Sequence, residues 1–142
     1  MMKAEELPYE QTIFRESWGL LKDVRNDPSC LAESMRTAAG MIAVFDGSIY
    51  RGLARTLYST AVLPYSEREA VLVDEAYQRC WELLKKYGDA VADETFGMLI
   101  REGSALVERF NREPGAYAAA LRIALAVIEH IEGLARARMA AA

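Results

Sequence analysis

Residues 114–139 read PGAYAAALRIALAVIEHIEGLARARM, and this stretch decides the fold because it has the period of a helix and is apolar nearly all the way round. Arg122 is the only charged residue in its first half. A helix with one wet face keeps its apolar residues in a stripe, whereas a helix without such a face must be enclosed by neighbours. We therefore expect either the other segments of the chain or a second copy of the chain to cover this helix.

The segments before this helix also have a helical period, and clear breaks separate them. The breaks lie at residues 27–28, 46–47, 63–65, 88–89 and 111–115. The break at Gly47 either ends a helix or only weakens a longer one, since an isolated glycine costs about 1 kcal/mol inside a helix. No stretch alternates with period two. The sequence therefore predicts an all-α bundle of five or six helices with a largely buried C-terminal helix, in a single all-helical domain spanning residues 1–142.

Composition places the chain among ordinary globular proteins. It has 142 residues, of which 52% are hydrophobic and 27% charged, enough to bury a core without disulfides or metal. The net charge of −4 argues against nucleic acid as a partner, because nucleic-acid binders need a surplus of lysine and arginine. Cys30 and Cys80 each stand alone in an apolar helical context, as buried thiols do.

Targeting signals are not evident in the sequence. The opening MMKAEELPYE lacks the apolar core of a signal peptide. No apolar run approaches the length of about 18 residues that a membrane span needs. We therefore expect a cytoplasmic protein that does not cross or bind a membrane.

No combination of residues indicates catalysis. His130 is the one histidine, and Val127 stands three residues before it, so the Glu-x-x-His pair of a diiron bundle is missing. Spacing alone leaves open a dyad between His130 and Cys30 or Cys80, although a lone histidine beside Glu129 is more often structural. Phosphate-binding glycine loops and the nucleophile-elbow motif do not occur. We expect no catalytic residues, no metal site and no cofactor.

The best candidate for a ligand contact is a group of three residues in the middle of the chain. Arg51, Arg55 and Tyr58 follow i, i+4, i+7 spacing, which predicts a shared helix face. Two guanidinium groups and a phenol can hold a phosphate or a partner's carboxylate. The ordinary alternative is a set of solvated arginines on the outside of a helix.

Two segments of the sequence share a pattern. Residues 14–22 read FRESWGLLK and residues 77–85 read YQRCWELLK, 63 residues further along. One interpretation is a duplicated helical unit with pseudo-twofold symmetry. The other is that amphipathic helices reuse the same aromatic and leucine spacing, since the halves do not otherwise align.

A family resemblance covers about the last two-thirds of the chain. It is carried by YQRCWELLKKYGD at residues 77–89, the acidic segment that follows, and ALRIALAVIEHIE at residues 120–132. These stretches resemble small helical proteins, without an assigned activity, from bacterial phages and mobile elements. The resemblance implies an accessory or counter-defence binding protein and assigns no functional residue.

These observations favour a non-enzymatic, oligomeric binding or adaptor protein that acts through protein–protein contacts. An uncovered apolar face is rare on a monomer, and twofold pairing is the commonest way to cover one. The residues expected to mediate self-association are Leu121, Val127, Ile128, Ile131 and Leu134. Three alternatives remain: the C-terminal helix is the central strut of a monomer, the protein sequesters a small anionic or nucleotide-like ligand with Arg51 and Arg55, or it is an enzyme of unidentified type.

Overall fold

The structure is a computed structural model that describes residues 1–141. Between these residues it contains helices, turns and loops but no strand, which confirms the predicted all-α bundle. Two one-turn 3₁₀ helices span Ala4–Glu6 and Pro28–Cys30. The six longer helices are α1 Pro8–Asn26, α2 Leu31–Val44, α3 Arg51–Ala61, α4 Glu67–Tyr87, α5 Asp93–Glu108 and α6 Pro114–Ala141.

Local signals in the sequence explain where several helices begin and end. The Asp27 carboxylate accepts a hydrogen bond from the backbone N–H of Ser29 at 3.2 Å and so caps the turn that leads into α2. Ser66 and Glu69 form a reciprocal capping box at the start of α4, with bonds of 3.1 and 2.9 Å. Gly47 has a φ of +75° in the loop after α2, so the break there does end a helix.

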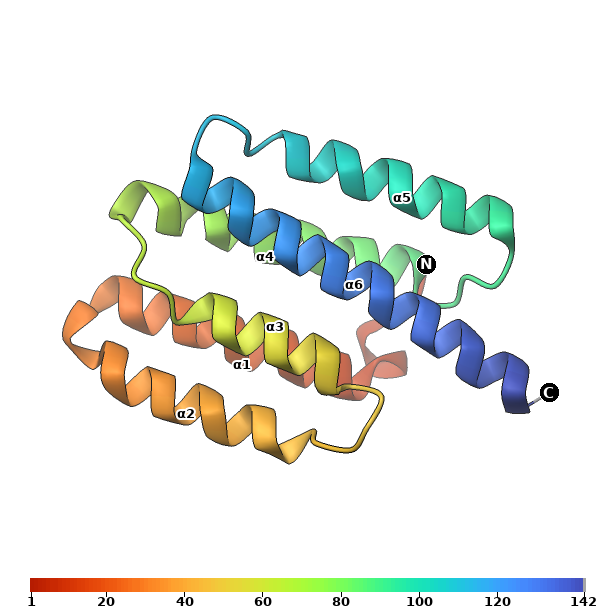
Figure 1. Cartoon of the computed structure of the whole chain (residues 1–142), viewed down its shortest axis with the longest axis horizontal. Helices are drawn as coiled ribbons and strands as arrows, with labels where there is room; N and C mark the ends of the chain where they lie inside the picture. The colour runs from red at the N-terminus through yellow and green to blue at the C-terminus, as the bar shows by residue number, and fades with distance from the viewer. Residues whose placement is uncertain (142) are drawn as a thin grey trace.

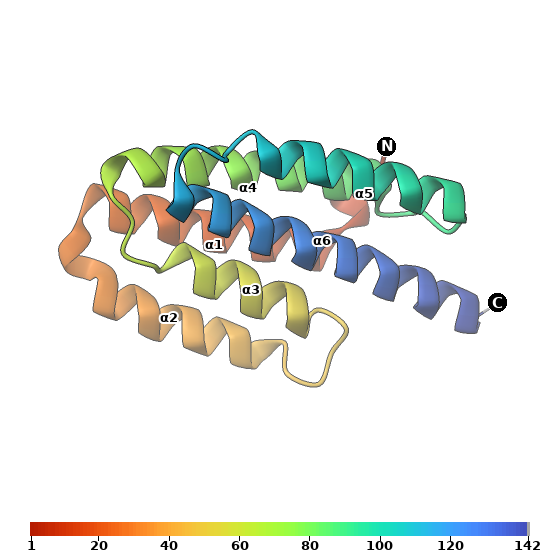
Figure 2. The same ribbon diagram turned by 45° about the horizontal axis from the view of Figure 1, so that its top comes forward.

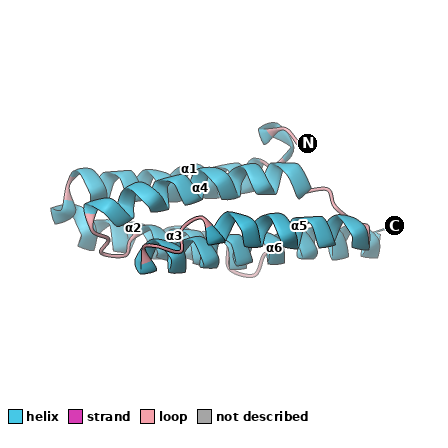
Figure 3. Cartoon of the chain, turned by 90° about the horizontal axis from the view of Figure 1, so that it is seen from above, coloured by secondary structure: helices cyan, strands magenta, loops and turns pink. Residues whose placement is uncertain are grey.

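Four helices form the centre of the bundle and two flank it. α1 packs against α3 and α4, and α6 packs against the same two helices. α2 covers the α3 side of this group, and α5 covers the α6 side (Figure 1). Seen from above, α1 and α4 lie in one layer, while α3 and α6 lie in the other (Figure 3). A continuous apolar core takes side chains from all six helices.

The two halves of the chain repeat one arrangement. In the first half α3 contacts both α1 and α2, and in the second half α6 contacts both α4 and α5. Lys22 lies 4.4 Å from the centre of the Trp18 ring, and Lys85 lies 5.6 Å from that of Trp81, so the shared sequence pattern forms the same cation–π pair twice. This correspondence agrees with the duplicated-unit interpretation, which stays a prediction.

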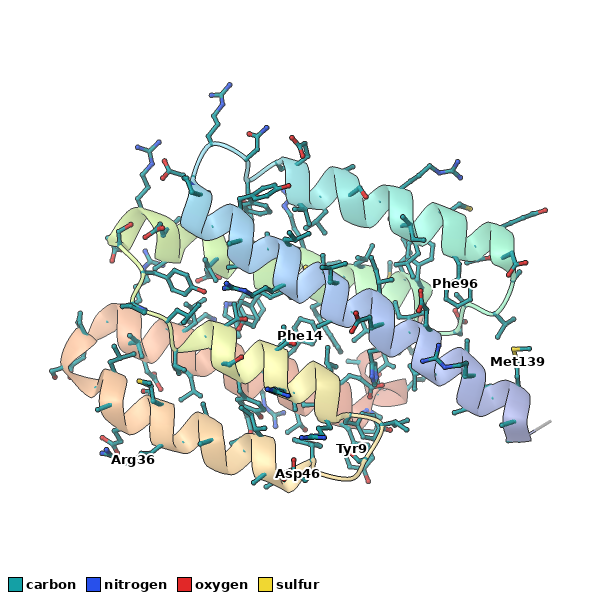
Figure 4. The ribbon with its side chains drawn as sticks, viewed as in Figure 1. Tyr9, Phe14, Arg36, Asp46, Phe96 and Met139 are labelled. Carbon is teal, nitrogen blue, oxygen red and sulfur yellow. The ribbon has the colours of Figure 1, made fainter. Side chains whose placement is uncertain are left out.

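The last helix is enclosed by three others. α3, α4 and α5 all pack against α6, which confirms the prediction of a largely buried C-terminal helix. Its buried side chains are mostly alanines, which allow neighbouring backbones to approach closely. Its last turns extend well beyond α3 and end about level with the beginning of α5, as Figure 2 shows, and Met139 lies on this end of α6 (Figure 4). Of the helices described, none has the length and hydropathy needed to cross a membrane.

The predicted self-association residues are therefore only partly available. Val127 and Ile131 are fully buried within one chain, so their assignment to a subunit interface is wrong. The physical reason is that three helices of the same chain cover this side of α6. Ile128 and Leu134 are half-buried, and Leu121 is 38% exposed. α6 is thus the central strut of the single chain, and only its outer side remains for a partner.

Candidate functional site

The predicted arginine and tyrosine group does not form one exposed face. Tyr58 is fully buried, and its hydroxyl donates a hydrogen bond to Glu16 Oε2 at 2.9 Å. Burial, reinforced by this contact with a carboxylate, raises the pKa of Tyr58 well above its ordinary value. α1, α2 and α6 all pack against α3, so its exposed arc is narrow and excludes Tyr58. The assignment of Tyr58 to a ligand contact is therefore wrong.

The two arginines of that group also have different surroundings. Arg51 Nε lies 3.5 Å from Asp46 Oδ1 on the surface, so its charge is already partly balanced. Arg55 instead lines a groove of about 300 Å³ between α3 and α6, which Arg122 also lines. Among residues 1–141, neither Arg55 nor Arg122 has an acidic side chain within ion-pair distance. Sequence spacing found Arg55 but not its true neighbour, which comes from the last helix.

The outer side of α6 combines apolar and charged residues. Leu125 is 49% exposed there, and Arg122 and Glu129 are exposed on either side of it. Ile100 of α5 is also exposed, one helical turn from Gly103, the glycine that α6 approaches through Ile128. We call this surface the outer face of α6, and it consists of Leu121, Arg122, Leu125 and Glu129, with Ile100 beside it.

A buried acid–histidine pair lies between α1 and α6. His130 Nε2 of α6 is 2.9 Å from Glu10 Oε2 of α1, and the two side chains are only 2% and 3% exposed. The Tyr50 ring packs 5.5 Å from the His130 ring, and burial together with the Glu10 charge raises the pKa of Tyr50. Figure 4 shows Tyr9, a further ring beside Tyr50, near the loop between α2 and α3. The imidazole is therefore held by Glu10 in place of either cysteine.

Sequence reasoning missed Glu10, although a signal was present. Glu10 falls three and four residues before Ile13 and Phe14, on the side of α1 that carries the apolar stripe. A carboxylate in such a position needs a buried partner, because an unpaired buried charge is costly. The partner lies 120 residues away on the last helix, so spacing along the sequence could not identify it. The contact joins α1 to α6.

A groove of about 490 Å³ lies between α4 and α5. Most of its charged groups neutralise one another: Arg79 pairs with Glu75 at 2.9 Å, and Lys86 pairs with Glu102 at 2.6 Å. In the described part of the chain, no cluster of histidine, cysteine and carboxylate side chains is arranged to hold a metal ion.

Comparison with family models, with curated proteins and with solved structures gave no match. The resemblance to proteins of phages and mobile elements therefore stays a prediction. Function is inferred from the residues of this chain alone.

Proposed function

We propose that the protein is a non-catalytic binding or adaptor protein that works as a homodimer, joined through the outer face of α6. The observation that carries the proposal is the order of charges on that face. Arg122 and Glu129 are seven residues apart, which places them two turns apart on one side of α6 with Leu125 between them. Opposite charges about one turn to either side of an apolar residue make the face complementary to itself.

A twofold axis through Leu125 explains this order. When a second α6 runs antiparallel across the first, Arg122 of each copy lies opposite Glu129 of the other, and the two copies of Leu125 meet at the axis. Leu121 and Ile100 extend the apolar contact beside it, and both are exposed in the single chain. Such a contact satisfies the rule that a twofold interface uses the same patch on both subunits. Charge pairs at its edge would set the orientation.

The test compares the mass of the protein in solution with that of a charge-reversed variant. Light scattering behind size exclusion should give about twice the 15.8 kDa chain mass at micromolar concentration. Arg122→Glu removes two attractive charge pairs from the dimer and introduces two repulsive ones. At about 0.5 kcal/mol for each of these four pairs, the dimer loses about 2 kcal/mol and its Kd rises roughly 30-fold. Arg36→Glu on α2 is the matched control, because Arg36 is exposed on a helix that packs against α1 and α3 (Figure 4).

The expected result is a dimer for the wild type and the Arg36→Glu control, and a monomer for Arg122→Glu with an unchanged circular dichroism spectrum. Exposed positions of this kind change stability by less than about 0.5 kcal/mol. A wild type that stays at the chain mass over the whole concentration range would refute the dimer. If Arg122→Glu remains a dimer like the wild type, the proposal that the dimer interface lies on α6 is refuted.

The second candidate function is the binding of a small anion in the groove between α3 and α6. It is favoured by the guanidinium groups of Arg55 and Arg122, which outnumber the one carboxylate in the lining, that of Glu129. Arg55 is the cation of the groove that lies outside the outer face of α6, whereas Arg122, Leu125 and Glu129 belong to both surfaces. If the groove binds anions, phosphate should raise the thermal midpoint of the wild type but not of Arg55→Glu.

A further inference from the structure

A groove of about 250 Å³ between α1 and α4 is lined by both tryptophans of the chain. Its lining residues belong to α1 and α4, which form one layer of the bundle, whereas α6 belongs to the other layer (Figure 3). The groove therefore does not depend on the proposed dimer contact. Its principal lining residues are Phe14, Arg15, Trp18, Gly19, Lys22 and Trp81.

The two indole rings in this groove are held in place by buried or polar partners. The Trp18 indole N–H donates a hydrogen bond to Asp74 Oδ1 at 2.8 Å. The Trp81 ring packs on Phe14 with centroids 5.2 Å apart, and Phe14 is itself buried in the core. Both tryptophans are only half-buried, and in the unliganded protein their exposed surface is partly covered by the ammonium groups of Lys22 and Lys85. A rigid, exposed aromatic surface loses little freedom when a planar ring stacks on it.

Positive charge at the rim of the groove is not neutralised by the protein. Lys22 lies over the Trp18 ring, and Arg15 is exposed next to the groove. Within residues 1–141 neither side chain has an ion-pair partner, whereas nearby Arg25 and Lys85 pair with acidic residues. A ligand that stacks on Trp18 would therefore displace the Lys22 ammonium group from the ring and meet it, together with Arg15, at the rim.

We propose that this groove binds a planar aromatic anion, with a nucleoside monophosphate as the simplest member of that class. The base would stack on the exposed indole surface, and the phosphate would lie at the rim against Arg15 and Lys22. The volume is below the range of pockets for drug-sized ligands, so it accommodates one ring system with the phosphate outside. Two free cations also do not make the long basic track that single-stranded nucleic acid requires.

Gly19 lines the groove and leaves space there because it has no side chain. A Cβ atom built at Gly19 would meet nothing within 4 Å, so a side chain there has room to extend into the groove. Gly19→Leu should fill the groove without disturbing the core, and leucine is the better helix former. Gly40→Leu is the matched control, because Gly40 is exposed on α2 and its Cβ would also meet nothing within 4 Å.

The groove can be monitored directly, because the chain has two tryptophans and both line it. Adenosine monophosphate should quench the intrinsic fluorescence in a saturable way. Adenosine should bind about 10-fold more weakly, since it lacks the charge-assisted contacts to Arg15 and Lys22. Inorganic phosphate alone should leave the fluorescence unchanged over the same concentration range, because it has no ring to stack.

The variants decide whether the groove is the site. Gly19→Leu should abolish the quench and Gly40→Leu should keep it. Arg15→Gln with Lys22→Gln should weaken binding of the monophosphate to the level of adenosine, while Arg36→Gln on α2 should leave it unchanged. The proposal is overturned if the wild type shows no saturable quench, if Gly19→Leu binds like the wild type, or if the double glutamine variant keeps the preference for the phosphate.

Discussion

Replacing Glu10 with leucine should destabilise the fold by about 2 kcal/mol, because it leaves the His130 imidazole buried without a partner. The two side chains are 3% and 2% exposed, so water cannot take the place of the lost carboxylate. Loss of one partner of a buried ion pair costs about 3–5 kcal/mol when the other group stays charged. The cost of leaving a buried polar group without its partner is about 1–3 kcal/mol, and the expected loss of about 2 kcal/mol lies within that range.

The assay is urea unfolding followed by far-UV circular dichroism, with the thermal midpoint as a second readout. At about 2–4 °C per kcal/mol for a domain of this size, the midpoint should fall by roughly 4–8 °C. Glu10→Leu with His130→Leu should recover most of the loss, because well-packed apolar residues replace a buried pair at little cost. Glu33→Leu, at an exposed position on α2, is the matched control and should stay within about 0.5 kcal/mol of the wild type.

Two results would refute this reasoning. One is a Glu10→Leu variant as stable as the Glu33→Leu control, which would mean that the pair contributes nothing to folding. The other is a double variant no more stable than Glu10→Leu, which would mean that His130 does not depend on Glu10.

Three further predictions test the core, a buried thiol and a close contact between helices. Val127→Arg should unfold the chain, because Val127 is fully buried and a new charge there has no partner; a folded, monomeric variant by circular dichroism and light scattering would contradict this. Burial raises the pKa of Cys80 from the ordinary 9.0 to about 12. Between pH 9 and pH 12 the folded state therefore keeps the thiol proton, whereas the unfolded state loses it. Stability should therefore be intact below pH 9 and fall as the pH rises towards 12, and Cys80→Ala should flatten that decline in urea titrations. Gly115→Ala should lower stability by about 1 kcal/mol, because the new Cβ would displace the Glu69 carboxylate from the capping box of α4. Gly133→Ala is the control and should leave stability unchanged, because its Cβ would meet nothing within 4 Å. Equal thermal midpoints for the two variants would contradict this steric explanation.

The helices and most of their limits could be predicted from the sequence because their causes are local. The capping box at Ser66 and the turn at Gly47 each depend on a few neighbouring residues, and the structure has both. The largely apolar circumference of α6 predicted that neighbouring helices would cover most of it, and they leave only its outer face exposed. What encloses it could not be predicted, because a helix pattern is the same whether its own chain or a second copy covers it. Val127 and Ile131 are the residues on which that ambiguity gave the wrong assignment.

The candidate sites depend on contacts between distant segments, and for that reason the sequence revealed only parts of them. Arg55 was found by its spacing, but its groove partner Arg122 belongs to another helix. Tyr58 was misplaced because its exposure depends on how many helices surround α3. The two tryptophan segments were recognised as a repeated pattern, yet their common groove exists only once α1 and α4 lie side by side.

The most direct measurement of the central proposal is the mass of an equimolar mixture of two variants, Arg122→Glu and Glu129→Arg. Each variant alone should be monomeric, because its own copies bring like charges together across the twofold axis. In a mixed pair, one chain is acidic and the other basic at both positions, so each contact across the axis again joins opposite charges. Light scattering of the mixture should therefore give twice the chain mass. If the mixture remains at 15.8 kDa while the wild type is a dimer, the copies do not pair through the outer face of α6.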